Sequence, residues 1–180
     1  MTHSLLTPVL ITPRLLLRPF EHEDAPALAD LLNDPGVAMG ICSAPLPFTR
    51  LHASARILMI RAREVAGKDF VWAVEDMDGN LIGNLGISET HSGTLRLGYA
   101  YARGHWGKGY ATEALAAVME WISRHLTIGE IHAEVFHDNP ASARVLAKAG
   151  FTETGHGARF SLARNTSEAT RRFTLQEHIA

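Results

Sequence analysis

The sequence contains one cysteine, no long apolar run and almost no net charge. With Cys42 alone, no disulfide can form within the chain, and a reducing compartment such as the cytoplasm is expected. No apolar stretch reaches the roughly 18–20 residues of a membrane span. The apolar segment Thr7–Leu17 is broken by two prolines and an arginine, which argues against a signal peptide. A net charge of −2 gives no general attraction to nucleic acid or to anionic membranes.

A metal site is not expected either. The ten histidines are spread along the chain, without the close spacing of His, Cys and carboxylates that holds a metal ion. What the chain does contain is an ordinary globular composition, with 46% hydrophobic and 20% charged residues over 180 positions. This length predicts one domain, residues 1–180, with a hydrophobic core of its own.

Hydrophobic periodicity and turn signals predict alternating helices and strands. A first helix begins at Asp24 and ends at Asn33-Asp34-Pro35-Gly36, and a second covers Arg50–Ala66. The apolar residues expected on their buried faces are Leu28, Leu31, Leu32, Ile57, Leu58 and Ile60. Strands are expected over Arg14–Pro19, Phe70–Glu75, Leu81–Ser88, Leu95–Tyr101 and Ile131–Phe136, and near Phe160 and Arg172–Leu175, with turns at Asp78-Gly79 and Ser92-Gly93.

The segment Leu95–Phe136 combines a strand, a tight loop, a helix and a second strand. Apolar residues recur at helical spacing over Tyr110–Leu126, and a further helix ends at Gly150. This order is one βαβ unit, so its strands, Leu95–Tyr101 and Ile131–Phe136, are expected to be parallel neighbours. The sequence therefore predicts an α/β fold.

The loop of this unit, Gly104–Thr112 (GHWGKGYAT), is the most informative segment. Its glycines let the backbone approach a ligand, and the first N–H groups and the dipole of the following helix favour an anion such as phosphate. The Walker A motif requires Ser or Thr where Gly109 stands, and the dinucleotide fingerprint requires Gly or Ala where Thr112 stands. Both motifs fail, which leaves another phosphate ligand or a glycine turn that binds nothing.

A second motif begins the helix that follows the partner strand. Asn139 is a good N-cap, Pro140 suits the first helical position and Gly150 suits a helix stop. These three roles are structural. Ser142 is not explained in this way, because its hydroxyl lies in the first helical turn at the same end of the sheet as the glycine loop.

Together these motifs resemble the GCN5-related N-acetyltransferase (GNAT) superfamily, and within it the branch of the bacterial ribosomal-protein N-terminal (RimJ/RimL-like) acetyltransferases. The resemblance extends from about Thr12 to Leu175. The matching segments are Arg14–Pro19 (RLLLRP), Leu81–Gly83 (LIG), Leu97–Tyr99 (LGY), Gly107–Leu115 (GKGYATEAL) and Asn139–Ser142 (NPAS), followed by Leu146, Lys148, Gly150 and Phe151.

The resemblance implies a mixed central sheet flanked by helices and a site for acetyl-CoA. Strands four and five of the family fold, here Leu95–Tyr101 and Ile131–Phe136, splay apart to admit this co-substrate. Its pyrophosphate is expected on the N–H groups of Lys108 to Thr112, and its pantetheine arm along Tyr99–Ala102. The cofactor-binding residues so implied are Tyr99, Ala100, Tyr101, Ala102, Gly107, Lys108, Gly109, Tyr110, Ala111, Thr112, Asn139 and Ser142.

The resemblance also implies direct attack of a neutral amine on the thioester, with no covalent enzyme intermediate. Leu146 stands where many relatives carry a general-acid tyrosine, so Ser142 is the expected proton donor. Arg96 stands near the position of the usual glutamate base. Glu134, acting through water, is the expected base because its strand borders the gap. Other candidate bases are His132, His137, Glu89 and His91.

The implied activity is N-acetylation of a primary amine, either a protein N-terminal α-amine or the amine of another peptide or small molecule. An amine of low pKa is favoured, since no strong base is evident. No nucleic-acid or membrane partner is expected, and a homodimer is common among relatives. Two other classes stay open, namely a sensor that binds acyl-CoA without turnover and a domain whose loop holds a different phosphate ligand.

Overall fold

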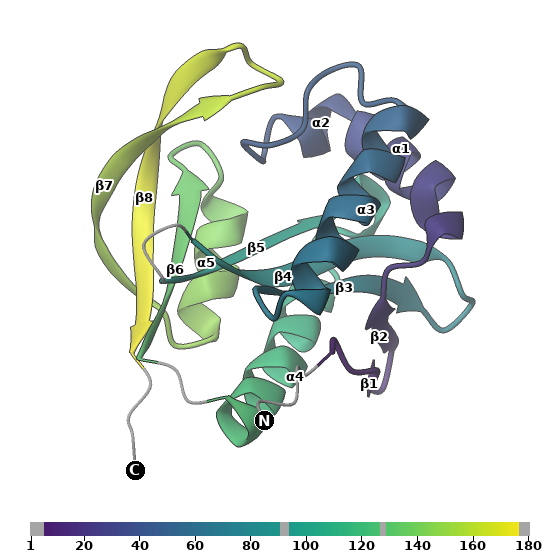
Figure 1. Ribbon diagram of the computed structural model, residues 1–180. Coiled ribbons are helices and arrows are strands. Elements are labelled where there is room, and N and C mark those ends of the chain that lie inside the picture. Colours follow the sequence, from purple (N-terminus) through teal and green to yellow (C-terminus); the bar gives the residue numbers. More distant parts are fainter. Residues whose placement is uncertain (1–5, 91–93, 127–128, 177–180) are drawn as a thin grey trace.

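The computed structural model describes residues 6–90, 94–126 and 129–176. Within them, eight strands form one mixed sheet in the order β1-β2-β3-β4-β5-β6-β8-β7 (Figure 1). The strands are β1 (Leu10–Ile11), β2 (Leu15–Pro19), β3 (Asp69–Asp76), β4 (Leu81–Glu89), β5 (Leu95–Tyr101), β6 (Glu130–Phe136), β7 (Thr152–Ser161) and β8 (Thr166–Gln176). The helices are α1 (Ala25–Asn33), α2 (Pro35–Ala38), α3 (Arg50–Val65), α4 (Tyr110–His125) and α5 (Pro140–Lys148), with short 3₁₀ turns at His22–Asp24 and Arg103–His105.

The pairing of β5 with β6 is the feature of the sheet that makes room for a site. It is parallel, as the βαβ unit predicts, whereas the other described pairs are antiparallel. It joins only three residue pairs and ends at Leu97, opposite Ala133. Beyond this point the two strands diverge, and Figure 1 shows β6 turning upward away from β5. The expected splay between the two strands is confirmed.

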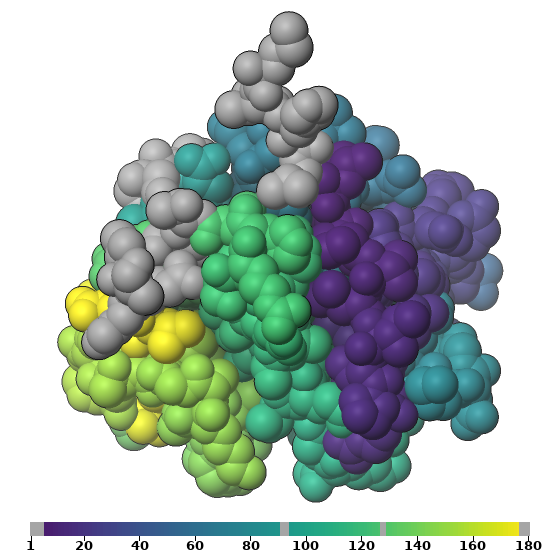
Figure 2. Space-filling view, turned by 90° about the horizontal axis from the view of Figure 1, so that it is seen from below, coloured from purple at the N-terminus to yellow at the C-terminus, as the bar shows by residue number. Residues whose placement is uncertain are grey.

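Two layers of helices cover the sheet, and the alternation of side chains along β5 separates them. Leu97 and Tyr101 belong to a buried cluster that includes Leu115 of α4. Ala100 points to the opposite face, into a cluster that includes Leu28 of α1 and Ile57 of α3. Figure 2, seen from below, shows α4 (green) between the N-terminal segment (purple) and the C-terminal part of the chain (yellow). No helix of the described residues is long and apolar enough to cross a membrane.

The predicted helices and strands are all present, but several details differ. Sequence reasoning missed the two-residue strand β1 and the short helix α2. Asp34-Pro35-Gly36 does end α1, yet the Asp34 side chain then accepts hydrogen bonds from the N–H groups of Gly36 and Val37 and starts α2. The predicted turn at Ser92-Gly93 lies outside the described residues.

Asp24 occupies the predicted N-cap position of α1 but does not cap that helix with its side chain. Its carboxylate accepts a hydrogen bond from the Glu21 N–H (2.8 Å) and forms an ion pair with Arg18 (2.7 Å). Arg18 also pairs with Glu75 of β3 (2.5 Å). Burial raises the pKa of Asp24, but the Arg18 and Glu21 hydrogen bonds outweigh it, and the net pKa lies below the ordinary value.

The prediction that Leu58 is buried is wrong, because its side chain is 71% exposed. The helix α3 buries Ala53, Ile57 and Glu64, which recur at spacings of four and seven residues. Leu58 is about 100° around the helix from Ile57 and therefore falls outside this face.

Truncation of a core residue and of this exposed leucine provides a matched test of the packing. Leu115 of α4 is fully buried, so we expect Leu115→Ala to lower the free energy of unfolding by about 2–5 kcal/mol. Leu58→Ala removes the same atoms from an exposed helix position and is expected to change it by less than about 0.5 kcal/mol. Urea denaturation followed by circular dichroism measures both values. Equal losses in the two variants would contradict the assignment of the core.

Candidate active site

The glycine loop has the backbone conformation that an anion site requires. Gly107 and Gly109 have φ values of +73° and +84°, which favour glycine. Gly109 is the N-cap of α4, and no described side chain caps this helix. The first N–H groups of α4, from Tyr110 to Thr112, therefore lack intrahelical partners and point out of the helix start. Together with the helix dipole, they form a site suited to phosphate.

Contacts from the N-terminal segment hold this loop in place. The Arg14 guanidinium donates a hydrogen bond to the Lys108 carbonyl (2.9 Å) and forms an ion pair with Glu113 (2.6 Å). It also lies over the Tyr110 ring, 4.7 Å from the centroid. The Arg14 N–H and the Thr12 hydroxyl donate to the same Glu113 carboxylate. Sequence reasoning did not find this support, because its partners lie about a hundred residues apart.

A groove of about 660 Å³ runs from the loop to the gap between β5 and β6. It is lined by most of the residues that were predicted to bind the cofactor. These lining residues are Tyr99, Ala100, Tyr101, Gly107, Gly109, Tyr110, Ala111, Thr112, Asn139 and Ser142. Three cationic side chains that were not predicted also line it, namely Arg144, Lys148 and Arg164.

Ala102 and Lys108 are the two predicted cofactor residues that do not line the groove. The Ala102 N–H donates a hydrogen bond to the Ile82 carbonyl (2.8 Å), and the Ala102 carbonyl accepts one from the His105 N–H (2.9 Å). Both backbone groups of Ala102 are therefore occupied within the protein. Lys108 lies in the loop, and its carbonyl accepts the Arg14 hydrogen bond described above.

The edge of β5 offers free backbone groups along the groove. The N–H of Ala102 points toward β4, and the backbone groups of successive strand residues alternate in direction. The N–H groups of Tyr99 and Tyr101 consequently face the gap, where pairing with β6 has ended at Leu97. An extended amide-containing chain could add to this edge as a strand does, which fits the pantetheine arm of CoA. The Tyr101 carbonyl is already bonded to the Trp106 indole N–H (2.6 Å).

A second cavity of about 330 Å³ lies on the face of the sheet covered by α3. Gly86 and Gly98 are neighbours across β4 and β5 and contribute to its floor. A Cβ at Gly98 would meet open space within 4 Å. Arg56 and Ile60 of α3 line the cavity from the other side. Because it opens toward the gap from the face opposite α4, this cavity can hold a second substrate.

The two cavities share a small set of lining residues at the splay between β5 and β6. Those residues are Gly40, Ile41, Tyr99, Ala100 and Ser142. There the Tyr99 hydroxyl lies 2.7 Å from the Ser142 hydroxyl and donates to the Ser142 carbonyl (3.1 Å). Asn139 caps α5 by accepting a hydrogen bond from the Ser142 N–H (3.1 Å), as its N-cap role predicts. Sequence reasoning found Ser142 but missed its hydroxyl partner.

Tyr99 carries its proton over the whole neutral range. Burial raises the pKa of Tyr99 to about 12, although the hydrogen bond with Ser142 acts in the opposite direction. The phenol is thus protonated below this pH. The Tyr99–Ser142 pair supplies hydroxyl groups at the meeting point of the two cavities.

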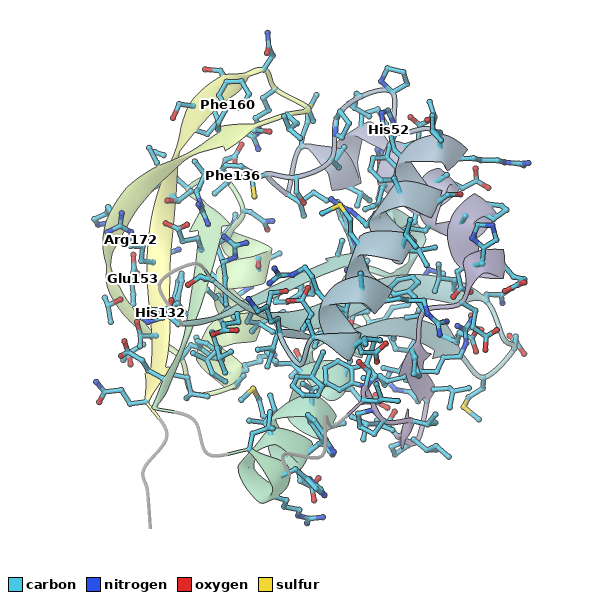
Figure 3. The ribbon with its side chains drawn as sticks, viewed as in Figure 1. His52, His132, Phe136, Glu153, Phe160 and Arg172 are labelled. Carbon is cyan, nitrogen blue, oxygen red and sulfur yellow. The ribbon has the colours of Figure 1, made fainter. Side chains whose placement is uncertain are left out.

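Glu134 lines the second cavity, as expected from its place on β6, but arginines contact both of its carboxylate oxygens. Arg159 of β7 lies 2.5 Å from one oxygen and Arg172 of β8 lies 3.3 Å from the other. Figure 3 shows Arg172 and Phe136 on the side of the gap formed by β6 and β8. Asp69, the other acidic residue that lines this cavity, pairs with Arg63 (2.8 Å).

The other candidate bases lie outside both cavities or outside the described residues. His132 pairs with Glu130 (2.8 Å). Neither His132, His137 nor Glu89 lines either cavity. His91 lies outside the described residues.

The turn of the β7–β8 hairpin contacts the segment after α2 and the start of α5, at the edge of the groove. Arg164 donates to the Met39 carbonyl (2.7 Å) and pairs with Asp138 (2.8 Å). The Leu162 N–H donates to the Cys42 carbonyl (3.1 Å). In Figure 1 the tip of this hairpin accordingly reaches toward the segment that follows α2. Within the described ranges, no three His, Cys, Asp or Glu side chains gather closely enough to hold a metal ion.

A long groove that begins at a helix start suited to phosphate and meets a second cavity at its other end is the geometry of a coenzyme-dependent transferase. The Acetyltransferase (GNAT) domain family matches residues 14–152, and the chain belongs to this family. It is an acetyl-CoA-dependent N-acetyltransferase, and the α/β fold and the co-substrate implied by the sequence are confirmed.

Three similar proteins illustrate this relationship. The uncharacterized N-acetyltransferase p20 of Bacillus licheniformis is 33% identical over 153 residues, which are 81% of this chain and 83% of that protein. The ribosomal protein uS5-alanine N-acetyltransferase of Escherichia coli K12 is 28% identical over 160 residues, 85% of this chain and 82% of the relative. The solved structure of RimL, a ribosomal L7/L12 alpha-N-protein acetyltransferase in complex with coenzyme A, has a TM-score of 0.83 at 17% identity and covers 94% and 98% of the two chains.

Proposed function

We propose that this enzyme acetylates the α-amine of a protein or peptide N-terminus by direct attack within a ternary complex. The observation that carries the proposal is the meeting of the two cavities at Tyr99 and Ser142. An acceptor in the second cavity and a thioester in the groove can meet there without crossing the sheet. Such positioning supplies much of the rate enhancement of a two-substrate reaction.

The residues at the meeting point match the charges that develop during transfer. Acetyl-CoA supplies the activated thioester. Of the two N–H groups that face the gap, those of Tyr99 and Tyr101, one can donate to the developing oxyanion while the other pairs with the pantetheine arm. The hydroxyl pair of Tyr99 and Ser142 can donate a hydrogen bond to the departing sulfur. A thiolate with a pKa of about 8.5 needs only modest stabilisation near neutral pH, so a hydrogen bond suffices and neither hydroxyl has to lose its proton.

The attacking amine must be neutral, and an amine of low pKa is neutral without help from a strong base. Glu134, acting through a water molecule, remains our prediction for the general base. Because both carboxylates that line the second cavity are held by arginines, little basic assistance is available. The α-amine of the uS5-alanine relative's substrate belongs to the same class of acceptor, which supports the proposal. A homodimer also remains a prediction.

A competition between two peptides tests the proposal. At pH 7.5 a lysine side chain, with a pKa of about 10.4, is neutral in only about one molecule in a thousand, a deficit of about 4 kcal/mol. An α-amine with a pKa of about 7.7–8.0 lacks only about 0.5 kcal/mol. We therefore expect faster transfer to a peptide with a free N-terminus and blocked lysine than to its mirror with a blocked N-terminus and free lysine. Mass spectrometry of the mixture between pH 6.5 and 9 measures the ratio.

One outcome of this competition would contradict the proposal. Preferential acetylation of the lysine peptide at neutral pH would overturn the α-amine assignment and would require a stronger base than the described site contains. As a control, the release of CoA thiol is measured in parallel, because thiol released without acetylated peptide reports hydrolysis of acetyl-CoA.

A further inference from the structure

The second cavity contains an arginine, Arg56, that no carboxylate of the described residues neutralises. Arg56 extends from α3 and donates hydrogen bonds to the Ser43 carbonyl (2.6 Å) and hydroxyl (2.8 Å). Its guanidinium also lies 5.3 Å from the centroid of the Phe48 ring. No ion pair with a carboxylate forms at Arg56 within the described residues. Burial removes part of the hydration of this cation, which no carboxylate of the described residues replaces, and it therefore lowers the pKa of Arg56 below its ordinary value.

Arg96 adds a second cation to the same cavity. It lies on β5 between Leu97 and Leu95, whose side chains point to the opposite face of the sheet. Its side chain therefore shares the α3 face with Arg56, and both residues line the cavity. In the part of the chain that the structure describes, Arg96 has neither a hydrogen bond nor an ion pair through its side chain. Among the described residues, Arg96 is therefore a free cation that lines this cavity.

The lining of the cavity carries more positive than negative charge. Its lining contains the arginines Arg56, Arg96 and Arg159 and the carboxylates Asp69 and Glu134. Those two carboxylates are also held by Arg63 and Arg172, which lie just behind the lining. The lining residues and their ion-pair partners thus include five arginines and two carboxylates. A cavity of this kind attracts anions and rejects an acceptor that carries only positive charge.

The phosphates of acetyl-CoA do not account for this excess. The glycine loop, where the phosphates are expected, lies at the end of the groove away from the second cavity. The groove also has its own cations in Arg144, Lys148 and Arg164. Neither Arg56 nor Arg96 lines the groove. The positive charge of the second cavity is therefore available to the acceptor.

We propose that Arg56 and Arg96 bind an anionic group of the acceptor, so that the preferred substrate is an N-terminal α-amine with a carboxylate or phosphate close to it in the chain. This proposal rests on the function proposed above and adds the substrate class. Guanidinium groups bind the oxygens of carboxylates and phosphates through paired, charge-assisted hydrogen bonds. Gly98 has no side chain, and the space above it is open within 4 Å. An anionic side chain of the acceptor therefore has room there.

Matched peptides test the proposal directly. The series has one N-terminal alanine and carries Glu, Gln, phosphoserine or Ser at position two or three, so that size is kept while charge changes. We expect the wild-type enzyme to show a kcat/KM about ten- to a hundred-fold higher for an anionic peptide than for its neutral partner, because hydrogen bonds to charged groups are strong. This ratio should fall toward one in Arg56→Met and in Arg96→Met, and should decrease with added salt. The larger of the Glu/Gln and phosphoserine/Ser ratios identifies the preferred anion.

Arg124→Met is the matched control, since Arg124 is an exposed arginine on α4 whose ion pair, among the described residues, is with Glu120 of the same helix. It should leave the ratio unchanged. Arg96 is an exposed strand residue, so Arg96→Met keeps the test valid if Arg56→Met unfolds, and thermal denaturation checks both variants. The proposal would be overturned if the wild-type enzyme had equal kcat/KM values for anionic and neutral peptides, whether the charge stands at peptide position two or three.

A binding measurement separates this inference from the proposed function. Calorimetry with CoA-saturated enzyme should show tighter binding of the Glu peptide than of the Gln peptide, with the difference lost in Arg96→Met. If no peptide is acetylated, the α-amine function fails, whereas the binding difference still decides the anion site. Equal or absent binding of both peptides rejects the anion site.

Discussion

Gly109→Asp should abolish acetyl-CoA binding while leaving the protein folded. The carboxylate would stand at the N-cap of α4, where the uncapped N–H groups of Tyr110 to Thr112 are available for phosphate. It would repel the pyrophosphate and compete for the same donors. Loss of two charge-assisted hydrogen bonds, at about 1.5–3 kcal/mol each, lowers the affinity by at least about a hundred-fold. Isothermal calorimetry measures this value.

Two control variants isolate the charge. Gly109→Asn has nearly the same shape and meets the same φ of +84°, so it measures the backbone strain without the charge and should bind more tightly than Gly109→Asp. Gly104→Asp adds an equal charge at an exposed glycine with open space around its Cβ position, outside the lining of the groove. It should bind acetyl-CoA normally. Unchanged affinity in a folded Gly109→Asp protein would remove the glycine loop from the cofactor site.

Ser142→Ala and Tyr99→Phe should each lower kcat by roughly ten- to a thousand-fold, because each removes a hydroxyl that can stabilise the departing thiolate by a hydrogen bond, an effect somewhat smaller than that of a full general acid. The affinity for acetyl-CoA should change far less. Because the two hydroxyls lie 2.7 Å apart, we expect them to act as a unit, and the double variant should be little worse than either single variant. Since the pKa of Tyr99 is about 12, the loss should be constant between pH 6.5 and 9. Pre-steady-state measurement of acetyl transfer gives these rates.

The structure supplies a control for the helix cap as well. Ser142→Ala keeps the backbone N–H that bonds to Asn139, so the cap of α5 survives this change. Asn139→Ala removes the cap and keeps both hydroxyls. If Ser142→Ala turns over at the wild-type rate and only Asn139→Ala is impaired, Ser142 is a structural residue and the hydroxyl pair has no part in transfer.

The backbone of the cofactor site could be predicted because its causes are local. Periodic apolar residues define α4 to within one residue of the predicted Tyr110–Leu126, and β5 has the predicted bounds Leu95–Tyr101. The glycines at 107 and 109 adopt the left-handed conformation that their residue type favours. Steric limits on φ and ψ act within a few residues, so the sequence shows them directly.

Side-chain partnerships could not be predicted, because they depend on which segments the sheet brings together. Leu58 was placed in the core on its apolar character, but the orientation of α3 exposes it. Ser142 was found from its place in a helix turn, whereas its partner Tyr99 lies 43 residues away on another strand. Arg14 supports the glycine loop from 94 residues away.

The sequence by itself determined the order of the main helices and strands, a glycine loop suited to an anion, and the family. Each of these follows from residues close together in the chain, where hydrophobic period and backbone conformation act. Only the tertiary structure decided that the hydroxyls of Tyr99 and Ser142 meet and that arginines hold Glu134. It also decided that Arg56 and Arg96 face the same cavity, where neither has a carboxylate partner among the described residues. These arrangements depend on strand register and on the divergence of β5 from β6 after Leu97, because a shift of one residue would turn every side chain of a strand to the other face.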